Sequence, residues 1–206
     1  MSEDAGGQVV PGWATGISPG PPSDTGQAVS FTVGNDSPGL FGAQPQVAPN
    51  GTLSYTPAAN ASGTATVTVT AIDDGGTAFG GSDTSAPQTF TVTVAEVNDA
   101  PSFFGGGKQV ELIGIGNQTV PGWATGISPG PPAEAGQSVT FSVTNDNPGL
   151  FTVQPQVLPN GTLTFSHGLL ALGSATVTVR AVDNGGIANG GIDTSPPQSF
   201  TITIIL

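Results

Sequence analysis

The sequence predicts an all-β protein built from two tandem Greek-key β-sandwich domains, and three observations support this. First, the segment VPGWATGISPGPP at residues 10–22 recurs unchanged at 120–132, and the match continues to the end of the chain at a constant spacing of 110 residues. Second, apolar and polar residues alternate with a period of two, which is typical of half-buried strands. Third, Gly- and Pro-rich turns separate these runs at short intervals, as they do in β-sandwiches.

The long repeat also predicts the domain organisation. A spacing of 110 residues is far longer than the few dozen residues of a solenoid repeat, so each copy must bury a core of its own. About 100 residues is a common size for an independent domain. We therefore expect one domain at 1–99 and a second at 100–206, connected through a linker at 96–101.

The alternation places the strands of the first copy. They are expected at 28–33, 40–47, 52–56, 64–72 and 88–97. In the run 64–72, alanine and valine point to one face and threonine to the other, which gives a core face and a hydroxyl-rich solvent face. The Asn-Gly pair within 49–52 predicts a tight turn with a positive φ. No stretch has a sustained helical period, and the copies are expected to superpose closely apart from 57–62 and 167–172.

Aromatic residues recur in both copies. Trp13 and Trp123, like Phe31 and Phe141, occupy corresponding positions. Buried aromatic side chains dominate the cores of such domains, so these four are interpreted as core residues. The alternative is an exposed aromatic platform on which a sugar ring stacks.

The charge balance excludes several classes of partner. The chain has 14 acidic residues but only two fixed cations, Lys108 and Arg180, and a formal net charge of −12. It cannot neutralise a series of phosphates, so nucleic acid and anionic membranes are excluded as partners. No apolar run approaches the roughly 20 residues that span a membrane. The first ten residues do not have the pattern of a signal peptide, and there is no cysteine.

The acidic residues are concentrated in loops and at strand ends. Turn preference explains Asp36, Asp146, Asp83 and Asp193, because aspartate favours turns. It explains Glu96, Asp99 and Glu134 less well, because glutamate is not a turn former. Carboxylates gathered at the end of a domain repel one another, and a hard cation bound between them would relieve that repulsion.

Several motifs resemble those of a known family. The linker Glu96-Val97-Asn98-Asp99-Ala100-Pro101 is similar to the interdomain linker of cadherins, in the form common in bacterial cadherin-like repeats. The segments 71–75 and 181–185 resemble the Ala-x-Asp-x-Gly strand-end signature of cadherins. The segment 132–136 resembles the family's Asp-x-Asp-x-Gly motif, with Glu134 at its second acidic position. The chain thus resembles tandem bacterial cadherin-like, immunoglobulin-like β-sandwich repeats of large extracellular adhesins or surface proteins.

The resemblance implies a calcium-bound junction between the two copies. The ligands it implies are Glu3 or Asp4 from copy 1, Glu96, Asn98 and Asp99 from the linker, and Glu134 and Asp183 from copy 2. Glu134 and Asp183 are expected at the rim of copy 2, outside its core. The acidic segment of the family is replaced here by 58–60, and Ala100 stands at the last linker position before the proline. One or two Ca²⁺ ions are therefore expected, fewer than the family's usual three.

Enzyme function is not expected. His167 is the single histidine and has no counterpart in copy 1, and neither it nor Lys108 nor Arg180 can be paired with a nucleophile. The leading interpretation is a calcium-rigidified stalk or fibre segment of an extracellular bacterial surface protein. Its partners would be neighbouring repeats, with cell-surface or polysaccharide ligands as further candidates. The alternatives are a carbohydrate-binding module and a self-assembling fibre subunit that exchanges strands.

Overall fold

The structure is a computed structural model of the chain, and it describes residues 1–114 and 116–206. The chain divides into two compact units. Unit 1 comprises Met1–Glu96 and unit 2 comprises Val97–Leu206. This division falls within the linker at 96–101, and each unit is described by itself.

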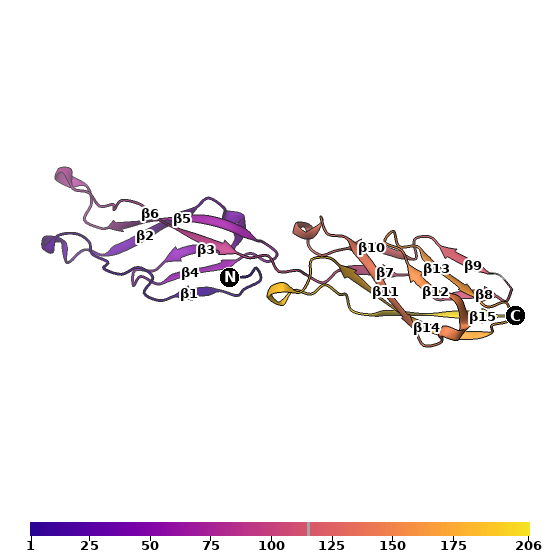
Figure 1. The fold of residues 1–206 in the computed structure, drawn as a ribbon. Helices are drawn as coiled ribbons and strands as arrows, with labels where there is room; N and C mark the ends of the chain where they lie inside the picture. The colour runs from indigo at the N-terminus through magenta and orange to yellow at the C-terminus, as the bar shows by residue number, and fades with distance from the viewer. Residues whose placement is uncertain (115) are drawn as a thin grey trace. The chain divides into compact units, whose positions relative to one another are not determined.

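Unit 1 consists of two three-stranded antiparallel sheets that form separate layers (Figure 1). One sheet has the order β1-β4-β3 and the other β2-β5-β6. The strands are β1 (Gln8–Val10), β2 (Val29–Asn35), β3 (Phe41–Val47), β4 (Leu53–Pro57), β5 (Gly63–Asp73) and β6 (Gln88–Val94). Five of these strands lie where the alternating pattern predicts them. The short strand β1 was not predicted, because three residues are too few to show a period.

Unit 2 repeats this sandwich and adds strands to it. Its sheets have the orders β12-β13-β9, β11-β14-β15-β8 and β10-β7. The strands are β7 (Ser102–Gly105), β8 (Gln109–Leu112), β9 (Asn117–Val120), β10 (Ala124–Ser128), β11 (Val139–Asn145), β12 (Phe151–Val157), β13 (Leu163–His167), β14 (Gly173–Asp183) and β15 (Gln198–Ile205). The predicted all-β fold of two sandwich domains is confirmed.

Helical structure in the described residues is limited to short 3₁₀ turns. They are η1 (Pro22–Asp24), η2 (Pro38–Leu40), η3 (Ala78–Gly80), η4 (Pro132–Glu134), η5 (Pro148–Leu150) and η6 (Ala188–Gly190). Four of them carry a proline at their start, where the fixed φ of proline suits a helical turn.

The central strand of each unit carries the core. In β5, Ala65, Val67 and Val69 are buried while the intervening threonines face outward. Strand β14 repeats this pattern with valine and alanine side chains that are almost completely buried. Each strand pairs on both sides with an antiparallel neighbour. Because the side chains of a strand alternate between its two faces, the apolar residues of β5 and β14 form one continuous apolar face in each unit.

The repeated aromatic residues differ between the units. Trp123 is buried, whereas its counterpart Trp13 is only half-buried, as are Phe31 and Phe141. The ring of Trp123 packs 4.5 Å from that of Phe200. The core interpretation is thus confirmed for Trp123, but the identical tryptophan of unit 1 is partly open to solvent.

The copies differ at the expected segments and at one further place. Residues 57–62 and 167–172 share their secondary structure, but Asn60 has a φ of +54° and its counterpart Leu170 has no positive φ, and the hydrogen bond from the Ala171 N–H to the Gly168 oxygen has no counterpart among the described residues of unit 1. The further difference lies at 14–18, which form no strand, whereas the identical sequence of unit 2 forms β10. The partner of β10 is β7, which follows directly on the linker. The alignment of the repeats could not show this, because the two segments have the same sequence.

The predicted turn before β4 requires its glycine. Gly51 has a φ of +82°, and a Cβ atom at this position would collide with the carbonyl oxygen of Ala14. Asn50 supports the turn, because its side-chain oxygen accepts a hydrogen bond from the backbone N–H of Thr52 at 3.0 Å. The Asn-Gly signal thus identifies both the turn and a close backbone approach.

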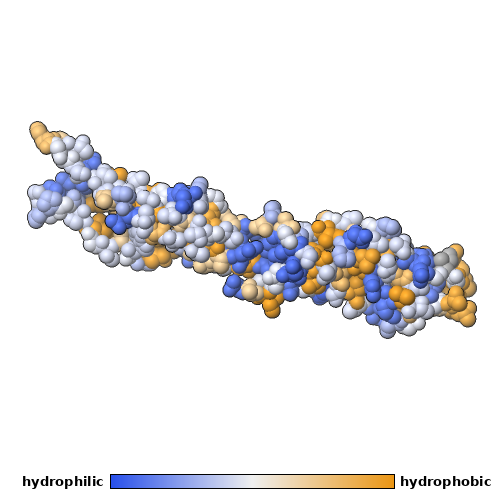
Figure 2. All heavy atoms as spheres, turned by 45° about the horizontal axis from the view of Figure 1, so that its top comes forward, coloured by the Kyte–Doolittle hydropathy of each residue, from blue (hydrophilic) through white to orange (hydrophobic). Residues whose placement is uncertain are grey.

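The surface is mixed in hydropathy. Figure 2 shows many residues of intermediate hydropathy on the visible face, with hydrophilic and hydrophobic residues scattered among them. Among the residues that the structure describes, no helix is long and apolar enough to cross a membrane.

An aspartate links two strands in each unit. In unit 1, Asp36 Oδ1 accepts a hydrogen bond from the backbone N–H of Thr66 at 2.8 Å, and the Asp36 N–H donates to the Thr66 oxygen. Asp146 and Thr176 form the same pair in unit 2. The backbone hydrogen bond to the carboxylate lowers the pKa of Asp36, and likewise the pKa of Asp146, below the ordinary value of 3.8.

These lowered pKa values predict an acid dependence of stability. A carboxyl whose pKa is lower in the folded state stabilises the fold above its unfolded pKa, and this contribution is lost as the pH falls through the folded pKa. The double variant Asp36→Asn/Asp146→Asn keeps an oxygen acceptor but cannot titrate. We expect its free energy of unfolding, measured by urea titration, to fall less than that of the wild type between pH 5 and pH 3. Equal losses in both proteins would contradict the prediction.

Candidate functional site

Four of the predicted ligands come together in unit 2. Glu134 ends η4 and Asp183 ends β14, and the linker residues Asn98 and Asp99 lie against them. Glu134, Asp183 and Asn98 are 4%, 7% and 8% exposed. Residues from three separate segments therefore form one compact polar cluster, which is called the linker cluster below.

Asn98 is the centre of the linker cluster. Its Nδ2 donates to Asp183 Oδ1 at 3.0 Å and to the backbone oxygen of Ile192 at 2.8 Å. Its Oδ1 accepts a hydrogen bond from Gln137 Nε2 at 2.9 Å. The Ile192 N–H also donates to the Asn98 backbone oxygen at 2.8 Å. This side chain thus connects the linker to two loops of unit 2.

Glu134 holds the next linker residue. Its Oε1 accepts a hydrogen bond from the backbone N–H of Asp99 at 2.8 Å. A Cβ atom at Gly130 would collide with Glu134 Oε2, so only glycine leaves room for this carboxylate. Glu134 and Asp183 are buried side chains. They lie outside the hydrophobic core of unit 2, as expected of residues at its rim, and the linker covers them.

The remaining predicted ligands belong to unit 1. Glu3 is buried, and its backbone N–H donates to the oxygen of Ala95 at 2.9 Å, beside the exposed Glu96. Asp4 is exposed, and its Oδ1 accepts a hydrogen bond from the Asn60 N–H at 3.1 Å. Asp4 has a φ of +56°, a conformation that aspartate tolerates better than most residues. Glu3 and Glu96 thus lie at the same end of unit 1, where the chain continues into the linker.

The donor set of the linker cluster fits a hard cation. Asp183 Oδ2 is buried and has no hydrogen-bond partner among the described residues, while Asp183 Oδ1 already accepts from Asn98 and Gly185. Ca²⁺ binds carboxylate and carbonyl oxygens of this kind. Within residues 1–114 and 116–206, no three Asp, Glu, His or Cys side chains form a preassembled metal-binding group. Unit 2 thus gathers, in one buried cluster, oxygen atoms of the kind that hard cations bind.

Sequence analysis missed one contributor to the linker cluster, Gln137, which supplies the hydrogen bond to Asn98. The glycine of the motif at 181–185, Gly185, lies so close that a Cβ atom there would collide with Asn98 Oδ1. Gln137 has a counterpart in Gln27 of unit 1, so its recurrence after a shared Gly was an available signal. The role of a neutral amide nevertheless becomes visible only when its partner is known.

The three residues for which no catalytic role is expected contact the backbone or face solvent. His167 ends β13, is buried, and its Nδ1 lies 3.0 Å from the oxygen of Gly168. Arg180 Nη1 donates to the backbone oxygen of Ser195 at 3.0 Å. Lys108 is exposed.

The exposed aromatic side chains do not form a repeated platform. Among the described residues they are Phe79 in unit 1 and Phe104 in unit 2. Asn189 stands at the position of unit 2 that corresponds to Phe79. A sugar-stacking surface common to both repeats is therefore not formed by these two residues.

The hydrogen bonds of Asn98 predict a stability effect. Asn98→Ala removes one of the two donors to Asp183 Oδ1 and the acceptor of Gln137 Nε2, and it should lower the free energy of unfolding of unit 2 by about 1–3 kcal/mol. Urea unfolding in a Trp13→Phe background lets Trp123 fluorescence report on unit 2 alone. Asn184→Ala, at an exposed residue that accepts one hydrogen bond from Ser138, is the matched control and should have a smaller effect. Equal effects of the two variants would contradict the role given to Asn98.

Comparisons with known proteins show the fold. No family model matches the chain, and no curated protein matches it in sequence. A crystal structure of human protocadherin-24 EC1-2 is similar to it, with a TM-score of 0.54 and 17% identity, covering 86% of this chain and 82% of the other. Chicken VE-cadherin EC1-2 matches with a TM-score of 0.37 and 14% identity over 100% and 96% of the two chains. Domains 4 and 5 of the S-layer protein SbsC match with a TM-score of 0.34 and 18% identity over 94% and 75%. On the protocadherin-24 match, the chain has the fold of tandem cadherin-like β-sandwich domains.

Proposed function

We propose that the chain is an extracellular structural or adhesive module in which Ca²⁺ stiffens the connection between consecutive repeats. The linker cluster of unit 2 is the observation that carries this proposal. Glu134 and Asp183 are buried together with the linker residue Asn98, and the backbone of the half-buried Asp99 donates to Glu134. A metal held there would therefore act on the segment that connects the repeats.

The charge of the chain favours a cation at this position. Burying a carboxylate disfavours its charged form unless a compensating charge or hydrogen bonds are present. The chain contains only two fixed cations. Lys108 is exposed and the Arg180 guanidinium donates to a backbone oxygen. A divalent cation that prefers oxygen ligands would compensate the buried negative charge directly.

The proposed ligands come from both repeats and from the linker. They are Glu3 or Asp4, Glu96, Asn98, Asp99, Glu134 and Asp183. One or two Ca²⁺ ions, each taking six to eight oxygen ligands, would draw on this set. Without the ion the carboxylates of the two repeats would repel one another, whereas a shared ion gains all of its ligands only when the repeats are aligned. Binding would in this way restrict the linker.

The proposed setting follows from the same residues. A chain of net charge −12 suits a stalk or fibre at a cell surface, with neighbouring repeats as its partners. A bacterial surface protein is the proposed source, on the form of the linker at 96–101. The alternatives, a carbohydrate-binding module or a fibre subunit, predict a glycan ligand or polymers and not a calcium-dependent linker.

Calcium should stabilise the chain and extend it. A ligand that binds only the folded state stabilises it by about 3–4 kcal/mol at 100–1,000 times its dissociation constant. We expect a higher melting temperature by calorimetry in calcium than in EDTA, and a larger maximum dimension by small-angle X-ray scattering. Unchanged values of both in millimolar calcium would overturn the proposal.

Matched variants separate the two parts of the proposed site. Glu134→Gln and Asp183→Asn should reduce the calcium-induced rise in melting temperature, because each removes a charged ligand. Asp24→Asn and Asp73→Asn change the corresponding residues of unit 1 and should leave most of the rise intact. Glu3→Gln and Glu96→Gln should reduce the calcium-induced extension. If both of the latter variants behave as wild type, a clamp that includes unit 1 is refuted.

A further inference from the structure

Identical sequences adopt different structures in the two units. Residues 124–128 form β10 in unit 2, whereas residues 14–18, which have the same sequence, form no strand in unit 1. The difference follows from the partner strand β7, which pairs antiparallel with β10 through Gly105–Ala124 and Phe104–Thr125. The sequence of 14–18 therefore has the capacity to pair with such a strand.

Strand β7 is anchored in unit 2 by an aromatic side chain and a glutamine. Phe103 is 4% exposed, and its ring lies 5.2 Å from that of Phe141 in an edge-to-face contact. Gln198 Nε2 donates to the Phe103 oxygen at 2.6 Å, and its Oε1 accepts from the Gly105 N–H at 2.9 Å. A Cβ atom at Gly106 would lie 2.6 Å from Trp123 Cδ1, so the glycine lets the chain pass closely over the indole.

The corresponding place in unit 1 is hollow. A cavity of about 360 Å³ lies between Trp13, Phe31, Val69 and Ala71, with Gln88 at its edge. The side chain of Gln88, the counterpart of Gln198, makes no hydrogen bond among the described residues. The residues around the cavity are also more exposed than in unit 2. Trp13 and Ala71 are half-buried and Ser85 is exposed, whereas their counterparts Trp123, Ala181 and Ser195 are buried.

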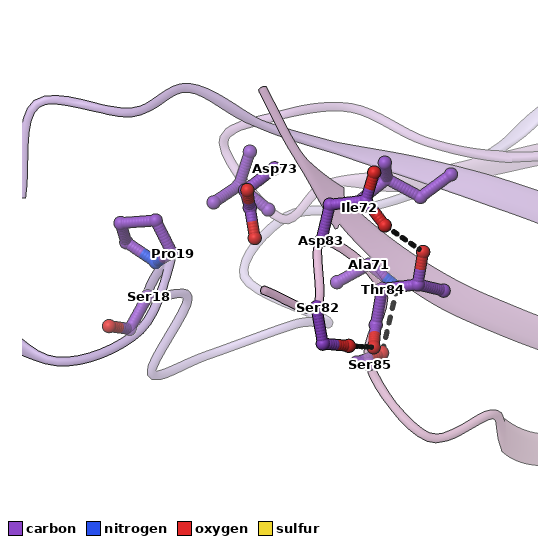
Figure 3. A pocket seen from close by; sticks show the side chains of 10 residues that line it. Ser18, Pro19, Ala71, Ile72, Asp73, Ser82, Asp83, Thr84 and Ser85 are labelled. Carbon is purple, nitrogen blue, oxygen red and sulfur yellow. Dashed lines mark hydrogen bonds between the residues drawn. The ribbon is translucent and has the colours of Figure 1, made fainter. Parts of the chain in front are cut away.

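A second hollow extends this cavity toward the acidic end of unit 1. It has a volume of about 150 Å³, and Figure 3 shows Ser18 and Pro19 on one side and Ser82–Ser85 on the other, with Asp73 between them. In unit 2 the counterparts of Asp73 and Ser82 are Asp183 and Ile192, to which Asn98 binds. The two hollows are adjacent, since both are lined by Ala71 and Ser85, and together they are called the strand groove below.

We propose that the strand groove of unit 1 binds an extended strand with the sequence of 98–106, Asn-Asp-Ala-Pro-Ser-Phe-Phe-Gly-Gly. The bound strand would pair antiparallel with residues 14–18 and place its first phenylalanine against Trp13 and Phe31. Gln88 would form two hydrogen bonds with the backbone of the bound strand, as Gln198 does with β7. Addition of a strand to an open edge, with side-chain pockets that select its sequence, is an established mode of peptide recognition.

The strand comes from outside the two repeats. In a second copy of the chain, the matching strand β7 already fills the groove of its own unit 2. Exchange between copies would therefore empty one groove for every groove that it fills, with no net gain in buried surface or hydrogen bonds. A strand of this sequence that is not already paired within its own repeat would gain both buried surface and hydrogen bonds on binding. The proposal involves no metal and is independent of the calcium function proposed above.

A synthetic peptide tests the proposal. The peptide has the sequence of 97–108, capped at both ends, and is titrated into the full chain by calorimetry and by amide NMR in EDTA. We expect saturable one-to-one binding with shifts at residues 14–18 and Gln88. A peptide with alanine in place of Phe103 should bind about tenfold more weakly or worse, since a phenylalanine burial is lost. Alanine in place of Phe104, which is exposed in unit 2, should change the affinity by less than about threefold.

Variants of the chain provide the second test. Gln88→Ala should weaken peptide binding, whereas the matched change Gln198→Ala in unit 2 should not, with circular dichroism checking that both variants are folded. Three results would overturn the proposal: no saturation at millimolar peptide, equal binding of the peptide lacking Phe103, or shifts confined to unit 2. Dimers of the chain alone that dissociate when the peptide is added would show that a second copy occupies the groove, which contradicts the assigned source.

Discussion

The pairing of one long central strand with two neighbours is the constraint on which each unit depends. Strand β14 pairs with β15 through 173–179 and with β11 through 177–183, and its alternate residues form the buried face of the core. The same strand ends at Asp183. The position of this carboxylate is therefore set by the register that buries Val177 and Val179, because a slip of one residue would turn every side chain to the opposite face. The register of β14 therefore determines both the packing of the core and the position of Asp183 in the candidate site.

The linker completes unit 2 in two ways. Asn98 and Asp99 cover Asp183 and Glu134 with hydrogen bonds, and a few residues later Phe103 enters the aromatic core. In unit 1 the corresponding acids Asp24 and Asp73 are only half-buried. The acidic residues at this end of a sandwich are therefore buried only where a linker segment covers them. The linker does so in unit 2, whereas the corresponding acidic residues of unit 1 remain partly open to solvent.

Calcium binding and strand binding would act on neighbouring parts of each repeat but rest on different chemistry. The proposed metal site depends on carboxylate charge, whereas the strand groove depends on apolar burial and backbone hydrogen bonds. Salt and chelators should therefore affect the first and leave the second largely unchanged. A repeat that receives both an ion and a strand would be held at its end by two independent interactions.

The fold class, the main strands and the turn at Gly51 could be predicted from the sequence, because alternation and turn chemistry are local properties that do not depend on distant contacts. The sequence also identified Asn98, Asp99, Glu134 and Asp183 as candidates by motif. It could not show that Glu134 and Asp183 are buried, that Gln137 supports Asn98, or that residues 14–18 and 124–128 differ. These points depend on contacts between segments that are distant in the sequence. Burial and strand pairing depend on which distant segment lies alongside, and two identical sequences carry no information about a partner that only one of them has.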